Sequence, residues 1–197
     1  IASYGANTIE FITMSTTGNS SDFGDLTQGV ASGAGGGNST RGVVGGGYTP
    51  ETSPATRVNT IQFVTIASTG NAQDFGDLTT GRYSIGACSN STRGVWAGGQ
   101  RRSPSPDTST MTLMEFLTIP TLGNVVEFGE LSVARSTASA VSSNTRGVWG
   151  GGYAPSSTDV IDYVEFATQG TAVDFGNLTV RIGGKGSAAS NGHGGLG

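Results

Sequence analysis

Groups that could act as nucleophiles or general bases are scarce in this chain. It contains one His, His193, and one Cys, Cys88. A Ser-His-Asp triad requires a histidine as general base, so any such site would have to use His193. A disulfide and a cysteine-based zinc site each require more than one Cys, and we therefore interpret Cys88 as a small buried apolar residue. We expect no catalytic residue in this chain.

Paired carboxylates are the second kind of group that could carry out chemistry. Two acids roughly 5–10 Å apart can hydrolyse glycosides, and clustered oxygens can hold calcium. Here the acids recur at regular intervals, whereas an active site needs one unique set of groups. No Asp-x-Asp-x-Asp-Gly loop is present. We interpret the acids as bonding turns and neighbouring sheets, with repeated arginines as candidate partners, and expect no enzyme activity, metal or cofactor. The pairs are Asp22/Asp25, Asp74/Asp77 and Glu127/Glu130, with Asp174 and Asn177 at the fourth position.

Binding residues are sought in three variable stretches, 48–57, 100–109 and 153–159, each of which follows a run of glycines. Loops held by a rigid scaffold are the usual place for recognition. Tryptophan can stack on a sugar ring, although Trp96 and Trp149 align with Val44 and Leu196 in the repeat described below, which favours core packing for both. The candidate binding residues are Tyr48, Trp96, Arg101, Arg102, Trp149 and Tyr153.

An internal repeat organises the whole chain. Phenylalanines in an acidic-Phe-Gly context recur at steps of 52, 53 and 47 residues, and an Arg-Gly-Val block follows the first three of them by 18 residues. At this offset the fourth copy has His193, which we read as a polar residue at a strand start. A period near 50 residues is typical of propeller repeats. The Phe positions are 23, 75, 128 and 175, and an upstream block reads Ile9-Glu10-Phe11, Ile61-Gln62-Phe63, Met114-Glu115-Phe116 and Val164-Glu165-Phe166.

Each repeat predicts four short strands and no helix. Residues 8–13 are rich in β-branched and aromatic types, and Gly18-Asn19 is a tight hairpin turn signal. In the fourth copy the loop would be three residues shorter. We predict an all-β, kelch-like β-propeller of four four-stranded blades in one domain, 1–197, with repeats at about 1–48, 49–99, 100–153 and 154–197. The repeated Phe side chains would fill the space between blades, and the glycine runs would lie where strands crowd together.

The chain ends suggest how the ring closes. Residues 193–197 stop inside the Arg-Gly-Val block of the fourth copy, and residues 8–13 begin the first copy. We predict that the C-terminal strand pairs beside the N-terminal one, since closure removes unpaired strand edges. Two alternatives stay open: the chain is part of a larger ring, or two chains share one ring.

Composition excludes several classes of protein. Charged residues make up 12 % of the chain, against about 25 % in typical proteins, which is incompatible with a coiled coil. The net charge is −4, and this argues against nucleic acid as a partner. No apolar run approaches the roughly 20 residues that span a bilayer, so we expect no membrane insertion.

The order of these motifs resembles known repeat proteins. A Gly-Gly-Gly-Tyr run, a variable loop, an aromatic return strand and an Arg-led strand together resemble kelch-type propellers. The segments Asn-Thr-Ile-Glu-Phe-Ile-Thr and Ser-Thr-Arg-Gly-Val, with the ending Ser190-Asn191-Gly192-His193, resemble repeat proteins of tailed bacteriophages, especially those of marine cyanobacteria. The resemblance covers nearly all of the chain.

The resemblance implies a non-enzymatic structural protein of a phage virion, in a tail fibre or comparable appendage that serves host attachment. The expected location is therefore the virion. Expected partners are other virion proteins, a host surface glycan or receptor, and further copies of this chain in a homo-oligomer. The alternative function is a carbohydrate-binding, lectin-like propeller module with one shallow site per blade.

Overall fold

The computed structural model describes residues 7–49, 55–102, 108–184 and 186–190. These residues form β-strands, turns and loops and contain no helix, as the strand-like repeats predict. There is thus no helix among them that could span a membrane. The strands are β1 Thr8–Phe11, β2 Ser21–Asp25, β3 Ala34–Gly37, β4 Arg41–Gly45, β5 Tyr48–Thr49, β6 Thr56–Arg57, β7 Thr60–Thr65, β8 Gln73–Asp77, β9 Gly86–Ser89, β10 Arg93–Ala97, β11 Gln100–Arg102, β12 Thr108–Thr110, β13 Leu113–Thr118, β14 Val126–Glu130, β15 Ser139–Ser142, β16 Arg146–Gly150, β17 Tyr153–Ala154, β18 Ser156–Glu165 and β19 Val173–Ile182.

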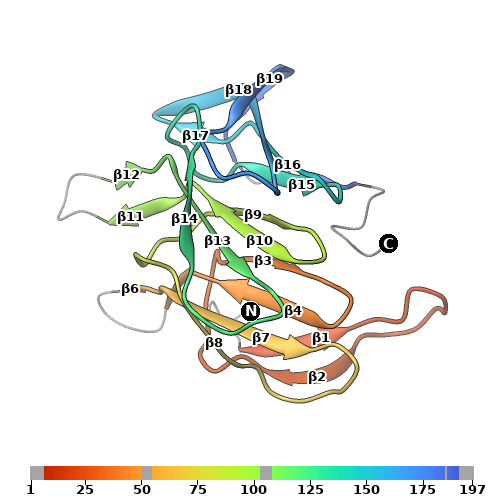
Figure 1. Cartoon of the computed structure of the whole chain (residues 1–197). Helices are drawn as coiled ribbons and strands as arrows, with labels where there is room; N and C mark the ends of the chain where they lie inside the picture. Colours follow the sequence, from red (N-terminus) through yellow and green to blue (C-terminus); the bar gives the residue numbers. More distant parts are fainter. Residues whose placement is uncertain (1–6, 50–54, 103–107, 185, 191–197) are drawn as a thin grey trace.

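Antiparallel sheets follow one another in a stack (Figure 1). The two-stranded sheet β1-β2 comes first, and we call it the N-terminal half-sheet. The sheets β3-β4-β7-β8 and β9-β10-β13-β14 follow, and the last sheet joins β15, β16, β18 and β19, with β17 also paired to β18. Each full sheet therefore takes two strands from one repeat and two from the next. The expectation that one repeat forms one blade is corrected: the Arg-led strand pairs with the strand that follows it across a short hairpin, and the chain changes sheets before β3, β9 and β15.

Apolar side chains form two cores, one on each side of the sheet β9-β10-β13-β14. Phe75 and Phe128 are both 2 % exposed, which confirms that the repeated Phe fills the space between sheets in the interior copies. Phe175, in the last sheet, is 57 % exposed, because no described strand covers it. Burial of such a side chain stabilises a fold by about 1.5–3 kcal/mol.

The Thr-Gly-Asn segments do not form tight turns, so that prediction was wrong. The strands β7 and β8 are joined by the seven residues 66–72, and the corresponding glycines contact the preceding sheet. Gly70 donates its N–H to the Phe23 carbonyl at 2.7 Å, and Gly123 donates to Phe75 at 2.9 Å. Gly170 repeats this bond to Phe128 at 2.8 Å. These bonds form a backbone seam between successive sheets.

Pairing in the last sheet corrects the alignment of the fourth repeat. Val148 on β16 lies opposite Tyr163, just as Val95 lies opposite Phe116 in the sheet before. Tyr163 also meets Phe175 edge-on at 5.8 Å, as Phe116 meets Phe128. The block Ile161-Asp162-Tyr163 is therefore the counterpart of Met114-Glu115-Phe116, and the loop that follows it is not shortened.

The described residues form an open stack. The N-terminal half-sheet and the strands β18 and β19 lie at opposite ends of the view in Figure 1. The strand expected to close the ring, residues 193–197, lies outside the described residues, as does His193. A closed ring of four blades therefore stays a prediction.

Candidate functional site

Short hairpins stand along one side of the stack, formed by β5-β6, by β11-β12 and by β17 with the start of β18 (Figure 1). We call this side the hairpin edge. Each hairpin begins directly after a glycine pair and is anchored to its own sheet by one isolated bridge. The bridges join Ala31 to Tyr48, Tyr83 to Gln100 and Ser136 to Tyr153.

The glycine pairs fix each hairpin against the residue seven positions after the repeated Phe, at or beyond the last strand of the same sheet. Gly47, with φ of +104°, donates its N–H to the Arg82 carbonyl at 2.8 Å. A Cβ at Gly46 would lie 2.8 Å from the Arg82 carbonyl oxygen, which belongs to the backbone, so a side chain does not fit there. Gly99 and Gly152 make the corresponding bonds to Arg135 and Ile182, at 2.9 and 2.7 Å. The crowding expected at the glycine runs is confirmed, and it holds all three hairpins in equivalent positions.

Candidate residues are sorted by the structure into two groups. Trp96 and Trp149 are fully buried, and their indole N–H groups bond the carbonyls of Ala34 and Gly86 at 3.1 and 3.2 Å. Their rings are therefore packed between sheets, in line with the core interpretation, and offer no face to a sugar. The other four, Tyr48, Arg101, Arg102 and Tyr153, lie on the hairpin edge.

Exposure differs among these four. Tyr153 is 44 % exposed and Arg101 is exposed, whereas Tyr48 is half-buried. The strand position of Arg102 is opposite Thr108. The Arg57 guanidinium lies 5.5 Å from the Tyr48 ring and 4.4 Å from the Tyr83 ring, so one cation contacts two tyrosine rings at this edge. The sequence interpretation did not include Arg57 or Tyr83.

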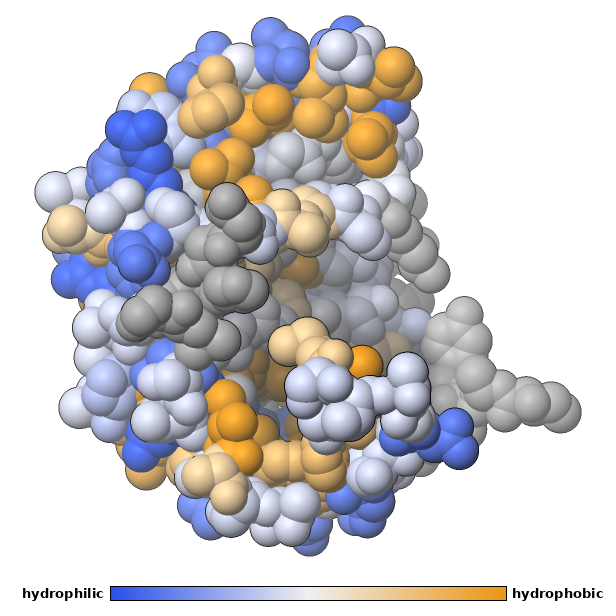
Figure 2. Space-filling view, turned by 90° about the vertical axis from the view of Figure 1, so that its right-hand side faces the viewer, coloured by the Kyte–Doolittle hydropathy of each residue, from blue (hydrophilic) through white to orange (hydrophobic). Residues whose placement is uncertain are grey.

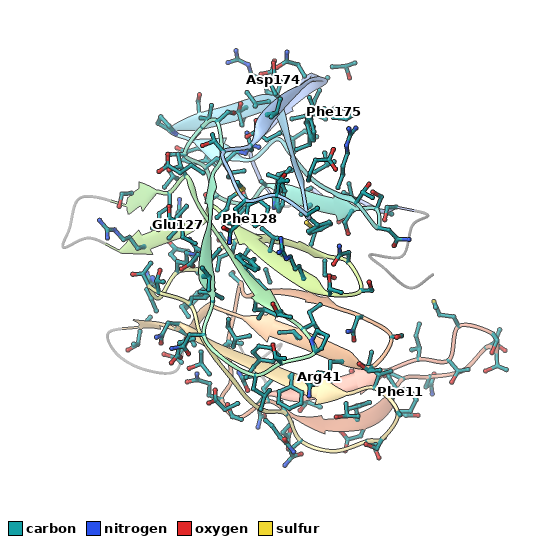
Figure 3. The ribbon with its side chains drawn as sticks, in the orientation of Figure 1. Phe11, Arg41, Glu127, Phe128, Asp174 and Phe175 are labelled. Carbon is teal, nitrogen blue, oxygen red and sulfur yellow. The ribbon has the colours of Figure 1, made fainter. Side chains whose placement is uncertain are left out.

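The repeated acids do not converge on one site. Figure 3 shows Glu127 and Asp174 on separate sheets of the stack. Asp22 accepts the Gly24 N–H at 3.1 Å, and Asp174 accepts the Gly176 N–H at 2.9 Å, so these two acids bond the backbone of their own strands, β2 and β19, and not turns as expected. Among the described residues, no group of three His, Cys, Asp or Glu side chains could hold a metal ion.

The repeated arginines stack on rings instead of binding these acids. Arg41 lies 4.9 Å from the ring centre of Phe63, and Arg93 lies 4.8 Å from that of Phe116. Arg146 lies over Tyr163 at 4.9 Å and also pairs with Glu165 at 2.5 Å. Arg146 therefore tightens its own sheet, whereas Arg41 and Arg93 also link successive sheets: they donate to the carbonyls of Ile119 and Phe166, just after β13 and β18.

Two other arginines, Arg82 and Arg135, are fully buried and form ion pairs between repeats. Arg82 donates to the Glu115 carboxylate at 2.7 Å, and its guanidinium also reaches the carbonyls of Leu113 and Trp96 at 3.3 and 3.4 Å. Arg135 pairs with Asp162 at 3.0 Å. Burial lowers the pKa of both arginines, and the facing carboxylate offsets part of that effect. Both guanidinium groups stay charged, because arginine is not deprotonated in proteins.

These ion pairs were missed by the sequence interpretation. Both arginines stand seven residues after the repeated Phe, which we call the seventh position, and each acid stands 13 residues before the next Phe. Val30 and Gln62 occupy the same two positions at the first junction between repeats. A search for paired charge changes between repeats would have found this pattern, once the fourth repeat was correctly aligned.

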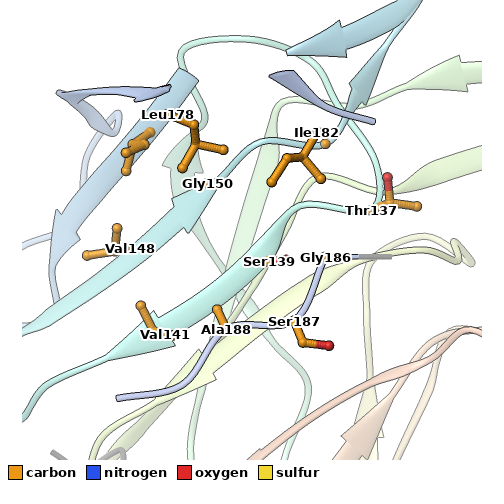
Figure 4. A pocket seen from close by; sticks show the side chains of 12 residues that line it. Thr137, Ser139, Val141, Val148, Gly150, Leu178, Ile182, Gly186, Ser187 and Ala188 are labelled. Atoms are coloured by element: carbon orange, nitrogen blue, oxygen red, sulfur yellow. The ribbon is translucent and has the colours of Figure 1, made fainter. Parts of the chain in front are cut away.

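Both ends of the stack expose apolar side chains, seen as orange areas at the top and bottom of Figure 2. At the C-terminal end a cavity of about 220 Å³ is lined by apolar residues including Val148, Ile161 and Leu178 (Figure 4). A Cβ on Gly150 would have its nearest neighbour at 3.8 Å, whereas one on the equivalent Gly45 would lie 3.1 Å from Trp96 Nε1. The cavity is therefore the position that a tryptophan fills between interior sheets.

Comparison with known proteins gave no match, either to any protein-family model or to any curated protein.

Proposed function

We propose that this protein is a non-enzymatic display scaffold of a phage virion, located in a tail fibre or comparable appendage that serves host attachment. The supporting observation is that two sets of side chains occupy different places in the structure. The repeated residues pack sheets together, whereas the residues that differ between repeats stand on the hairpin edge. The assignment to a virion rests on the sequence resemblance, and other virion proteins are the proposed partners.

The finer architecture belongs to the same proposal: the sheets are blades of a kelch-like β-propeller. Successive four-stranded antiparallel sheets with cores between them support it. The N-terminal half-sheet would be completed either by residues 193–197 of the same chain or by strands of another repeat. These two routes differ in the residue that would face Glu10.

A carbohydrate-binding module is the second candidate function. Tyr153 is the observation that favours it, because this aromatic residue is 44 % exposed at a hairpin and could stack on a sugar ring. Arg101, on the neighbouring hairpin, could donate hydrogen bonds to hydroxyl groups. The two candidate functions are compatible if the scaffold binds a host polysaccharide.

Immunogold electron microscopy tests the first proposal. Antibodies raised against this chain should label the appendages of phage particles purified from infected cultures. Particles that contain the chain only in the capsid interior, or not at all, would contradict a role in attachment.

A glycan array tests the second candidate. Binding to a glycan should be lost in Tyr153→Ala and reduced in Arg101→Ala. The matched control is Arg146→Ala, because this half-exposed arginine lies at the opposite end of β16 from the hairpin. Equal loss in all three variants, or no glycan bound at all, would argue against the lectin function.

A further inference from the structure

The N-terminal half-sheet lies at one end of the stack and carries Glu10. The residues at the equivalent positions of the later sheets are all buried. Glu10 lies opposite Asp22, as Gln62 lies opposite Asp74 and Glu115 lies opposite Glu127. Gln62 is 2 % exposed and Glu115 is 0 % exposed. Glu10 is exposed, and its carboxylate accepts only a hydrogen bond from the Ser20 hydroxyl, at 3.1 Å, among the described residues.

Charge is matched at every described junction between repeats. Glu115 receives Arg82 together with the hydroxyl and N–H of Thr79. Asp162 receives Arg135 and, in the same way, Ser132. At the first junction the seventh position is Val30, and the facing residue is the neutral Gln62, whose side-chain oxygen accepts from the N–H and hydroxyl of Thr27 at 2.6 and 2.7 Å. The facing residue is thus an acid where the seventh position is arginine, and an amide where the seventh position is valine.

The space beside Glu10 is open. A cavity of about 460 Å³ lies between Ile9 and Glu10 on one side and the strands β3 and β4 on the other. Phe11 is 41 % exposed, against 7 % for Phe63 and 9 % for Phe116, which the Arg-led strands of their own sheets help to cover. Among the described residues, the half-sheet therefore lacks the two strands that complete each later sheet.

We infer that the N-terminal half-sheet is a docking site for a strand pair from another repeat of this type, one that carries arginine at its seventh position. That arginine would pair with Glu10, and the arginine of its Arg-Gly-Val strand would lie over Phe11, as Arg41 lies over Phe63. Burying Glu10 without a cation would carry a large desolvation cost. The inference does not depend on what the hairpin edge binds.

The fourth repeat of this chain does not supply that arginine. Its seventh position is Ile182, whose carbonyl accepts the Gly152 N–H as the Arg135 carbonyl accepts that of Gly99. Arg181, one residue earlier, is 67 % exposed and lies 3.9 Å from Asp159. At the seventh position, therefore, neither the fourth repeat of this chain nor that of a second copy matches Glu10. This observation argues against a four-blade ring closed by this chain alone.

The test extends the full chain by one strand pair. Thr8 is equivalent to Thr60 in sheet register, so a duplicate of residues 26–52 placed directly before Ile1 restores the natural spacing. This duplicate carries valine at its seventh position. A second version carries Val30→Arg within the duplicate. Each version is made both with Glu10 and with Glu10→Gln, which gives four extended chains. Thermal unfolding is measured for these four, for the unextended chain and for its Glu10→Gln variant.

Matched combinations should be the stable ones. We expect Arg with Glu10, and Val with Glu10→Gln, to unfold at higher temperature than the two mismatched chains, by roughly 6 °C or more. In the unextended chain, Glu10→Gln should shift the midpoint by less than about 2 °C, because Glu10 is exposed there. Amide hydrogen exchange of β1 should slow in the matched chains.

Three results would overturn the inference. Equal midpoints in all four extended chains would mean that Glu10 does not recognise the incoming charge. Unchanged exchange at β1 would mean that the strand pair does not dock. A large midpoint shift from Glu10→Gln in the unextended chain would mean that a segment of this chain, or of a second copy, already covers Glu10.

Discussion

Buried charge is the most demanding feature of this protein at the scale of single residues. Placing a guanidinium and a carboxylate in a core costs several kcal/mol per ion, which is recovered only with good geometry and further hydrogen bonds. Arg82 meets this condition in part: its terminal nitrogens are bonded, but its Nε has no hydrogen-bond partner in the part of the chain that the structure describes. We therefore interpret the pair as specifying which repeats lie side by side, with little net gain in stability.

Removing one partner of this pair should be costly. We expect Glu115→Ala to lower the free energy of unfolding by about 3–5 kcal/mol, because Arg82 would remain buried and uncompensated. The double variant Arg82→Val/Glu115→Gln copies the first junction and should recover most of this loss. Urea denaturation measures both. A double variant as unstable as the single one would show that the pair itself supplies the stability.

Cys88 should be chemically silent in the folded protein. Burial raises its pKa well above the ordinary value, so the thiolate that reacts with iodoacetamide is not formed. We expect alkylation at pH 8 only after denaturation, measured by mass spectrometry. Because the folded pKa is raised, the stability contribution is complete below about pH 8.5 and declines as the pH rises further. Rapid alkylation of the native chain would contradict the buried position.

At the scale of elements, successive sheets are joined by backbone as well as by side chains. One seam links Gly70 to Phe23, and a second links Ser84 to Ser32 at 2.8 Å through their main chains. A third set uses side chains: the Asn38 amide donates to the Ser91 carbonyl at 3.0 Å, and Ser89 bonds Gly37 at 2.8 Å. The relative position of neighbouring sheets is therefore set at several points, which suits a rigid platform for the hairpins.

A side chain buried between two sheets should contribute more to the free energy of unfolding than the same residue type at the end of the stack. Phe75→Ala should cost about 3–5 kcal/mol, because this ring is buried between two sheets. Phe175→Ala is the matched control and should cost much less, since its ring is 57 % exposed. Guanidinium denaturation compares the two. Equal losses would mean that another surface covers Phe175 in solution.

At the scale of the whole molecule, the described part is an open stack whose two ends differ. One end presents Glu10 and Phe11, and the other presents the apolar cavity beside Gly150. The main contacts of the described strands join each sheet to its neighbours in the stack, so stability should build up sheet by sheet, as in other repeat proteins. The size of the final assembly then depends on what covers the N-terminal half-sheet and the last sheet.

Deleting residues 191–197 should leave the N-terminal half-sheet unaffected. We expect equal hydrogen exchange rates at β1 in the full and shortened chains, because an Ile182-type repeat does not match Glu10. Exchange mass spectrometry checks this, with the amides of β10 as the internal reference. Faster exchange at β1 after the deletion would instead support the ring closed by residues 193–197.

Features that depend on local pattern could be predicted from the sequence. Segments rich in β-branched and aromatic residues predicted strands without helix, and the recurrence of Phe75 and Phe128 predicted packing between sheets. These inferences were sound because strand propensity and repeated burial can be read from single segments. The repeat also predicted crowded glycines, which Gly46 and Gly47 confirm.

Tertiary structure alone decided how the repeats are joined. The exchange of strands between repeats, the counterpart role of Tyr163 and the pairing of Arg82 with Glu115 all depend on contacts between residues far apart in the chain. Such contacts are selected by sheet register and by the cost of burying an unpaired charge, and neither is visible in a short motif. For the same reason, Trp96 could be read as a ligand platform until its ring was placed between two sheets.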